Sequence, residues 1–127
     1  VISTRVGLGK VCILKNDTAI NQDLKGVIPI NPKIVEVNFL FYWFKAISKI
    51  IVEFGTGLTV QGVKLPFIKS LKINLPSINE QRIIINQIQS LQSHLNNIKI
   101  IKEKKINNLK FLKNSLLKDL LNKNKAA

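Results

Sequence analysis

The last 51 residues of the chain, 77–127, contain neither glycine nor proline and are rich in Ile, Leu, Lys, Asn and Gln. Glycine and proline are the residues that most often end a helix, so this stretch predicts one continuous helix reaching about Asn122. At 1.5 Å per residue the helix would be about 68 Å long. A globule built from residues 1–76 cannot bury a rod of that length, so most of the helix needs a partner outside this globule.

The start of the helix is marked by capping residues. Ser77 and Glu80 have the S-x-x-E spacing of a capping box, in which the serine hydroxyl accepts an early backbone N–H and the glutamate reaches back to the cap. Pro76, immediately before Ser77, ends the preceding segment. We therefore predict that Ser77 and Glu80 form the helix cap.

Apolar residues along the helix recur in alternating steps of four and three, the pattern of a coiled-coil seam. The same alternation places Lys102 and Lys105 on the seam, so the strict heptad is interrupted there and resumes afterwards. The predicted helix–helix interface consists of Ile84, Ile88, Leu91, Leu95, Ile98, Leu109, Leu112 and Leu116. Since the chain offers no second long helix, the partner is predicted to be another copy or another protein.

Residues 1–76 have a different composition, because they hold all six glycines and all four prolines. Short apolar runs between these residues predict strands, and Gly7 and Gly9 predict a turn between the first two. A helix is expected from an N-cap at Asn38 to Phe54, followed by a short turn or helix at residues 65–70. The expected strands are 1–3, 11–14, 27–30 and 71–75.

These elements predict an α+β fold with two parts. Residues 1–76 would form a small, mixed and irregular β domain with a buried helix, and residues 77–127 a long coiled-coil-type helix. Because the chain begins at Val1, within an expected strand, and contains no methionine, we expect it to be a fragment or a processed chain.

The chain is strongly basic, with 20 Lys and Arg against 7 Asp and Glu. Such an excess suits a polyanion such as nucleic acid, and also an anionic membrane surface. Lys, Asn and Ile are all abundant, however, as they would be if encoded by AT-rich DNA. Charge alone leaves both explanations open, and the lysines of the helix are more typical of a solvated face.

Membrane and secretory features are missing from the sequence. The densest apolar stretch, residues 39–54, is interrupted by Lys45, Lys49 and Glu53, and no run approaches the ~20 residues that span a bilayer. The single cysteine, Cys12, lies in an apolar run and is expected to be a buried, reduced thiol. We predict a cytoplasmic protein.

Catalytic patterns are equally weak. His94 is the only histidine and has no acidic or cysteine neighbour at ligand spacing, and the acidic residues form no pair suited to acid–base chemistry. The segment 6–10, Val-Gly-Leu-Gly-Lys, lacks the spacing of a phosphate-binding loop and is expected to be a turn. We predict no catalytic residue, no metal site and no cofactor, hence a chain that is not an enzyme.

Polar side chains cluster instead at strand ends and in glycine-containing loops. Arg and Lys can pair with guanine edges, Asn and Gln with adenine, and Ser or Thr with bases or phosphate. The same residue types are also common in ordinary loops. The candidate DNA-binding residues are Ser3, Thr4, Arg5, Lys10, Asn21, Gln22, Thr56, Thr59, Gln61 and Lys64.

Four segments, in this order, resemble the specificity subunit of type I restriction–modification systems. Residues 1–5 with 9–11 resemble the family's ISTRG…GKV pair, and 19–24 its AINQ segment. Residues 39–44 with 55–57 resemble its helix and following glycine loop. The most specific match is 73–83, INLPSINEQRI, which is similar to the IPLPPLxEQxxI junction. Val6 replaces a frequent glycine, and Ser77 replaces the second proline.

The resemblance implies a chain that covers the latter half of one target recognition domain and one spacer helix. It implies double-stranded DNA as a partner, together with the modification (methyltransferase) subunit and the restriction (translocase and endonuclease) subunit. It also implies that the helix pairs with a second specificity-type helix, as a homodimer if the chain is isolated. The expected function is sequence-specific recognition that directs the partner subunits to a bipartite DNA target.

A second hypothesis belongs to another class. The chain could be a basic coiled-coil adaptor, whose globular part binds protein and has no sequence-specific contact with DNA. Rising salt separates the two hypotheses, because phosphate contacts alone are lost equally on every duplex.

Overall fold

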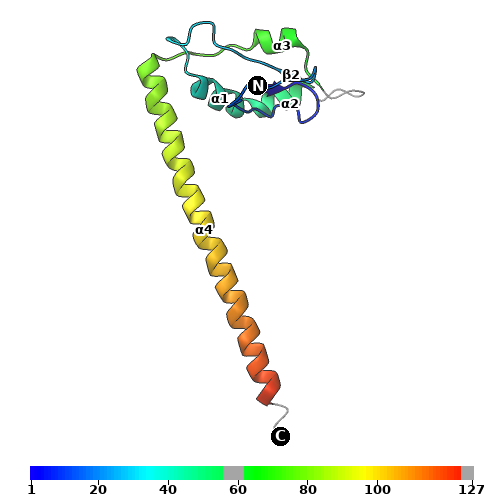
Figure 1. Cartoon of the computed structure of the whole chain (residues 1–127), viewed down its shortest axis with the longest axis vertical. Coiled ribbons are helices and arrows are strands. Elements are labelled where there is room, and N and C mark those ends of the chain that lie inside the picture. The colour runs from blue at the N-terminus through cyan, green and yellow to red at the C-terminus, as the bar shows by residue number, and fades with distance from the viewer. Residues whose placement is uncertain (56–61, 124–127) are drawn as a thin grey trace. The chain divides into compact units, whose positions relative to one another are not determined.

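The computed structural model describes residues 1–55 and 62–123, which fall into two compact units, Val1–Asn86 and Gln87–Ala127. Its elements are β1 (Ile2–Ser3), β2 (Leu24–Lys25), α1 (Val37–Ala46), α2 (Ser48–Gly55), α3 (Leu65–Ser70) and α4 (Ile78–Lys123) (Figure 1). This is the predicted α+β fold: a small, irregular β domain followed by a long helix. The first nine residues of α4 belong to the first unit, so that unit extends beyond the helix start predicted at residue 77.

The sheet is smaller than predicted. β1 and β2 pair antiparallel, with Ile2 opposite Lys25 and Ser3 opposite Leu24. Of the strand expected at residues 11–14, only Val11 makes a bridge, to Ile2. The strands expected at 27–30 and 71–75 were wrong, because both segments lack ladder pairing. β2 was missed because Leu24 and Lys25 carry no local strand signal. Its pairing is set by long-range contacts such as the Thr4 N–H donating to the Asp23 carbonyl at 2.8 Å.

The helix expected from Asn38 to Phe54 is two helices that meet at Ile47. Helical hydrogen bonds continue through the junction, from the Ile47 N–H to the Trp43 carbonyl and from the Ile51 N–H to the Ile47 carbonyl, each at 3.1 Å. Asn38 is not the N-cap. The cap position is Glu36, whose side chain makes no cap hydrogen bond. Its backbone N–H is instead held by Gln81 from α4, a tertiary contact that no local pattern shows.

The core of the first unit lies between the helices and the strand pair. Ile2, Phe44, Ile51 and Val63 are buried together, with side chains of α1 and α3 packed against them. In Figure 1 the strand pair lies between α3 and the α1–α2 pair. Phe54 and Phe67 stack with ring centroids 3.7 Å apart, which joins α2 to α3.

The turn after β1 explains the glycines at positions 7 and 9. Both adopt positive φ, 70° and 76°, a conformation that favours glycine. A side chain at Gly9 would also bring its Cβ to 2.9 Å from the Ser48 carbonyl oxygen of α2. The segment 6–10 is thus a turn, as predicted, and it packs closely on α2.

The cysteine was predicted wrongly. Cys12 is exposed, because the apolar run 11–14 is not a core strand but forms one side of a groove. Within residues 1–55 and 62–123, no helix has both the length and the apolar character needed to cross a bilayer.

Candidate nucleic-acid interface and helix seam

Thr4 brings together three of the segments that carry candidate DNA-binding residues. Its N–H donates to the Asp23 carbonyl at 2.8 Å, and its own carbonyl accepts the Val63 N–H at 2.9 Å. The loop that contains Asn21 and Gln22, the end of β1 and the segment before α3 are therefore neighbours.

The exposed charge at this place comes from Arg5 and Lys64, which flank Thr4 and Val63. Arg5 lies 3.5 Å from Asp23, and its side chain is 53% exposed. The Asp23 Oδ1 atom is buried and accepts no hydrogen bond in the part of the chain that the structure describes, so the arginine contact is a loose ion pair. Because the Arg5 side chain stays more than half exposed, its guanidinium can still reach another acceptor.

Ser3 and Thr4 are buried, unlike the other candidates among the described residues, which are exposed. The Ser3 hydroxyl donates to the Val6 carbonyl, and the Thr4 hydroxyl donates to the Asp23 carbonyl at 3.0 Å. Their hydroxyls thus hold the turn after β1 and the loop before β2, on either side of Arg5.

Asn21 and Gln22 are exposed on the loop before β2. The Asn21 Oδ1 accepts the Asp23 N–H at 3.1 Å, a local turn contact, and the Gln22 carbonyl accepts a hydrogen bond from the Lys25 ammonium at 2.6 Å. Lys10 is exposed in the turn after β1 and lines a shallow hollow with Lys45 of α1. Thr56, Thr59 and Gln61 lie outside the described residues.

The start of α4 shows both reciprocal contacts of a capping box. The Ser77 N–H donates to the Glu80 carboxylate at 2.8 Å, and the Glu80 N–H donates to the Ser77 hydroxyl at 3.4 Å. The Ser77 hydroxyl donates to the same carboxylate at 2.7 Å. These hydrogen bonds, first from the side chain and then from the backbone of Ser77, lower the pKa of Glu80.

The residue after the cap, Gln81, was not singled out from the sequence. It is fully buried, and its amide makes three hydrogen bonds of 2.8–2.9 Å: it accepts the Glu36 N–H and donates to the Ile34 and Pro76 carbonyls. Arg82 adds an ion pair to Glu36 at 2.8 Å. Consecutive residues thus cap α4 and clamp its first turn to the segment before α1. In the sequence, the Glu-Gln pair of the junction was the one hint of this role. The cap explains the glutamate of that pair but does not explain the glutamine.

The predicted seam residues differ in exposure. Ile84 and Ile88 are half-buried, whereas every seam residue after them is exposed, with Leu91 at 62% and Leu95 at 64%. A face of exposed leucines and isoleucines of this length is typical of an interaction surface.

The apolar positions of α4 follow the period of a straight helix. Ten steps carry the stripe over the 36 residues from Ile84 to Leu120, or 3.6 residues per step. The stripe positions are Ile84, Ile88, Leu91, Leu95, Ile98, Lys102, Ile106, Leu109, Lys113, Leu116 and Leu120. Leu112 lies to one side of this stripe. A strict heptad would instead impose a left-handed supercoil.

In the described part of the chain, no three His, Cys, Asp or Glu side chains are placed to hold a metal ion. His94 is exposed on α4. The structure thus presents two exposed surfaces. One is a basic edge in the first unit, where Arg5 and Lys64 lie beside Thr4. The other is the apolar stripe on the part of α4 that belongs to the second unit.

Comparison with known proteins identifies the family of the chain. No solved structure matches the chain. The family model described as type I restriction modification DNA specificity domain matches residues 1–124, almost the whole chain. The chain therefore belongs to the family of type I restriction–modification DNA specificity domains, whose role is DNA recognition.

Proposed function

We propose that this chain recognises one half of a bipartite DNA target and directs methyltransferase and endonuclease subunits to it. The observation that carries the proposal is the basic edge around Thr4, where loops from three parts of the chain present exposed polar side chains. Methylation and cleavage then belong to the partner subunits, and this chain supplies sequence recognition and spacing.

Arg5 is the best candidate for base recognition at this edge. Its guanidinium is exposed, its ion pair with Asp23 is loose, and Arg is the residue that most often recognises guanine through two hydrogen bonds. Lys64, Lys10 and Gln22 would contact phosphates or bases beside it. Ser3 and Thr4 would act indirectly, by holding the loops.

The spacing role is supported by the stripe on α4. Its step pattern is the same in both directions from Lys102, so two copies packed antiparallel about that residue place Ile84 opposite Leu120 and Leu95 opposite Leu109. Antiparallel pairing would hold two recognition domains at a distance set by helix length. The half-site spacing of the target follows from this length.

The same register brings the two Lys102 side chains together in a homodimer. Like charges at such a position weaken association, whereas a second specificity-type helix with an apolar or acidic residue there would not suffer this repulsion. We therefore expect the isolated chain to form a weak homodimer, which Lys102→Leu strengthens. Sedimentation of both proteins at tens of micromolar tests this, and a strict monomer in both cases would contradict helix pairing.

The recognition role is tested by DNA binding as salt is raised. Phosphate contacts alone weaken equally on every sequence, whereas base recognition leaves one duplex bound after scrambled competitors are lost. We expect one duplex from a random library to be retained by the wild-type chain and lost with Arg5→Ala. Lys33→Ala, at an exposed lysine outside the basic edge, is the matched control and should only weaken binding uniformly.

Equal loss on every duplex would instead favour the adaptor hypothesis, in which the globular part binds protein. That result would contradict sequence recognition by this chain even if the helices pair.

A further inference from the structure

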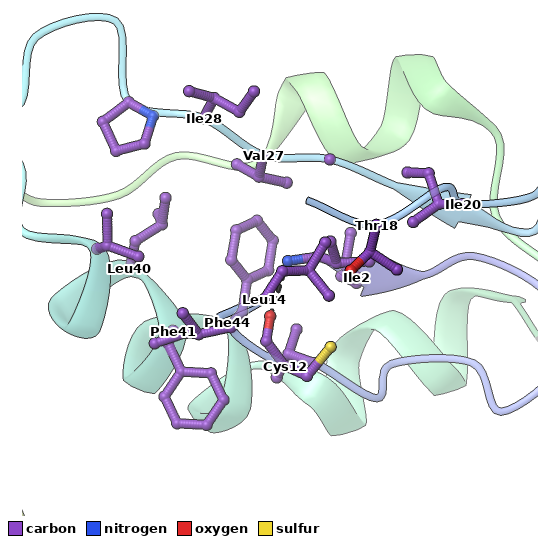
Figure 2. Close-up of a pocket in the computed structure, with 16 residues that line it drawn as sticks. Ile2, Cys12, Leu14, Thr18, Ile20, Val27, Ile28, Leu40, Phe41 and Phe44 are labelled. Atoms are coloured by element: carbon purple, nitrogen blue, oxygen red, sulfur yellow. Dashed lines mark hydrogen bonds between the residues drawn. The ribbon is translucent and has the colours of Figure 1, made fainter. Parts of the chain in front are cut away.

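Two hollows of different chemistry border the segment after β1, and Val11 contributes to the lining of both. Figure 2 shows the first, an apolar groove lined by side chains such as Leu14 and Phe44. The second has a volume of about 370 Å³, and its polar side chains belong to Lys10, Lys45 and Ser48. We propose that this second hollow, the basic hollow, binds a phosphate group of the DNA backbone.

The basic hollow forms where the turn after β1 packs on the helices. At Gly9 the backbone is so close to α2 that an added Cβ would lie 2.9 Å from the Ser48 carbonyl oxygen and 3.1 Å from Val52. Lys10 follows directly, so the turn brings a lysine to the helix surface. Lys45 and Ser48 are three residues apart, and helical hydrogen bonds continue through the junction of α1 and α2. Their side chains therefore occupy neighbouring positions on one helix face.

The polar groups of the basic hollow are available to an anion. In the part of the chain that the structure describes, neither Lys10 nor Lys45 pairs with a carboxylate, and the Ser48 hydroxyl has no hydrogen-bond partner. The Lys45 ammonium lies 5.4 Å from the centroid of the Phe41 ring, a contact that holds the cation without neutralising it. Both lysines are exposed, and Ser48 is half-buried.

A backbone phosphate suits these groups better than the edge of a base. Roughly half to two-thirds of protein–DNA hydrogen bonds go to phosphate and sugar, and Lys and Ser are among the usual donors. A lysine ammonium is a point charge and lacks the planar fork with which arginine recognises guanine. Because the chain belongs to a family of DNA specificity domains, duplex DNA is the polyanion expected at this surface. The inference therefore rests on the proposed function.

Ser3 connects the basic hollow to the basic edge. Its N–H donates to the Lys10 carbonyl at 2.9 Å, and its own carbonyl accepts the Gly9 N–H at 3.1 Å. Thr4 and Arg5 follow directly along the chain. Phosphate contacts set the register of a protein on the duplex, and base contacts then read the sequence. A phosphate held at the basic hollow would thus position the duplex for Arg5.

The test measures the affinity of the whole chain for a scrambled duplex at several salt concentrations. Each phosphate contact contributes about 0.9 to the slope of log affinity against log salt concentration, so Lys45→Ala should make this slope shallower by about 0.9. It should also weaken binding equally on every duplex. Ser48→Ala should weaken binding about fivefold without changing the slope, because it removes a hydrogen bond but no charge. The matched control is Lys49→Ala, at an exposed lysine on the next turn that does not line the hollow, and it should leave the slope nearly unchanged.

Equal slopes for Lys45→Ala and Lys49→Ala would overturn the proposal. A loss confined to one duplex with Lys45→Ala would also overturn it, because that result indicates a base contact. Helix content by circular dichroism shows that each variant is folded before affinities are compared. If all duplexes bind equally and Lys45→Ala alone makes the slope shallower, the basic hollow binds phosphate and the proposed sequence recognition is wrong. If no duplex binds, both proposals are wrong.

Discussion

The first turns of α4 and its later turns have very different surroundings. In the first unit, Gln81 and Ile85 are 0% and 6% exposed, because the segment before α1 and its neighbours cover them. In the second unit, Leu91 and Leu95 are 62% and 64% exposed. The face covered in the first unit is therefore not the face of the periodic stripe, whose first residue, Ile84, is half-buried there, and the apolar period alone did not indicate which side of the helix the domain covers.

The polar side chains of the first unit divide in a similar way. Ser3, Thr4 and Gln81 are buried and hydrogen-bonded to backbone, so they hold segments together. Arg5 and Lys64 are exposed at the edge that these contacts organise. Residue type alone does not separate the two groups.

The largest effect should come from truncating the buried apolar residue of α4. Ile85→Ala removes buried methyl groups and should lower the free energy of unfolding by about 3 kcal/mol, within the range for buried Ile→Ala. Leu95→Ala, its control on the same helix, should change it by less than about 0.5 kcal/mol in dilute solution. Urea unfolding measures both, and similar losses would show that the two stretches are equally covered.

Removing the buried amide should be nearly as costly. Gln81→Leu leaves the Glu36 N–H and the carbonyls of Ile34 and Pro76 without their partner, which should lower the free energy of unfolding by about 2 kcal/mol. The exposed Gln87→Leu is the control and should be nearly neutral in urea unfolding. If Gln81→Leu leaves the free energy of unfolding unchanged, the hydrogen bonds of Gln81 make no net contribution to stability.

Loss of the helix cap should have a smaller effect. Ser77→Ala removes the acceptor for the Glu80 N–H and should cost about 1 kcal/mol. Ser90→Ala, inside α4 and exposed, should be neutral or slightly stabilising because alanine has the higher helix propensity. Thermal unfolding followed by circular dichroism at 222 nm compares the two variants. Equal shifts of their melting temperatures would exclude a specific role for the cap.

The smallest effect is a pH dependence at the same cap. The pKa of Glu80 is lowered in the folded chain from its ordinary value of 4.5, so its contribution is present above that pH. It is lost as pH falls through the lower folded value. Glu80→Gln, which keeps a capping side chain but does not titrate, should be less stable than wild type at pH 7 and equally stable well below 4.5. If the difference in stability between the two proteins persists at low pH, the lowered pKa of Glu80 is not its cause.

Local chemistry was enough to predict α4 and its start. The absence of Gly and Pro, the S-x-x-E spacing and the apolar period all act within a few residues, and the helix found, Ile78–Lys123, agrees with the one expected. α3 was also anticipated. The strands were not, because short apolar runs such as 11–14 and 27–30 form strands only when a neighbouring edge is available.

The candidate site could also be predicted only in part from the sequence. The sequence indicated which loops carry polar side chains, and the family match agrees with DNA recognition. It did not show that Thr4 is held by Asp23 or that Gln81 clamps the first turn of α4 to Glu36, since these contacts join residues 19 and 45 positions apart in the chain.

The sequence by itself determined the long helix, its cap and its basic, apolar-striped character, because these follow from neighbouring residues. Only the tertiary structure decided which polar residues support the loops and which face solvent. It also decided that the apolar run 11–14 would border a groove instead of joining the core. These outcomes depend on hydrogen bonds and packing between distant segments, and no local pattern encodes them.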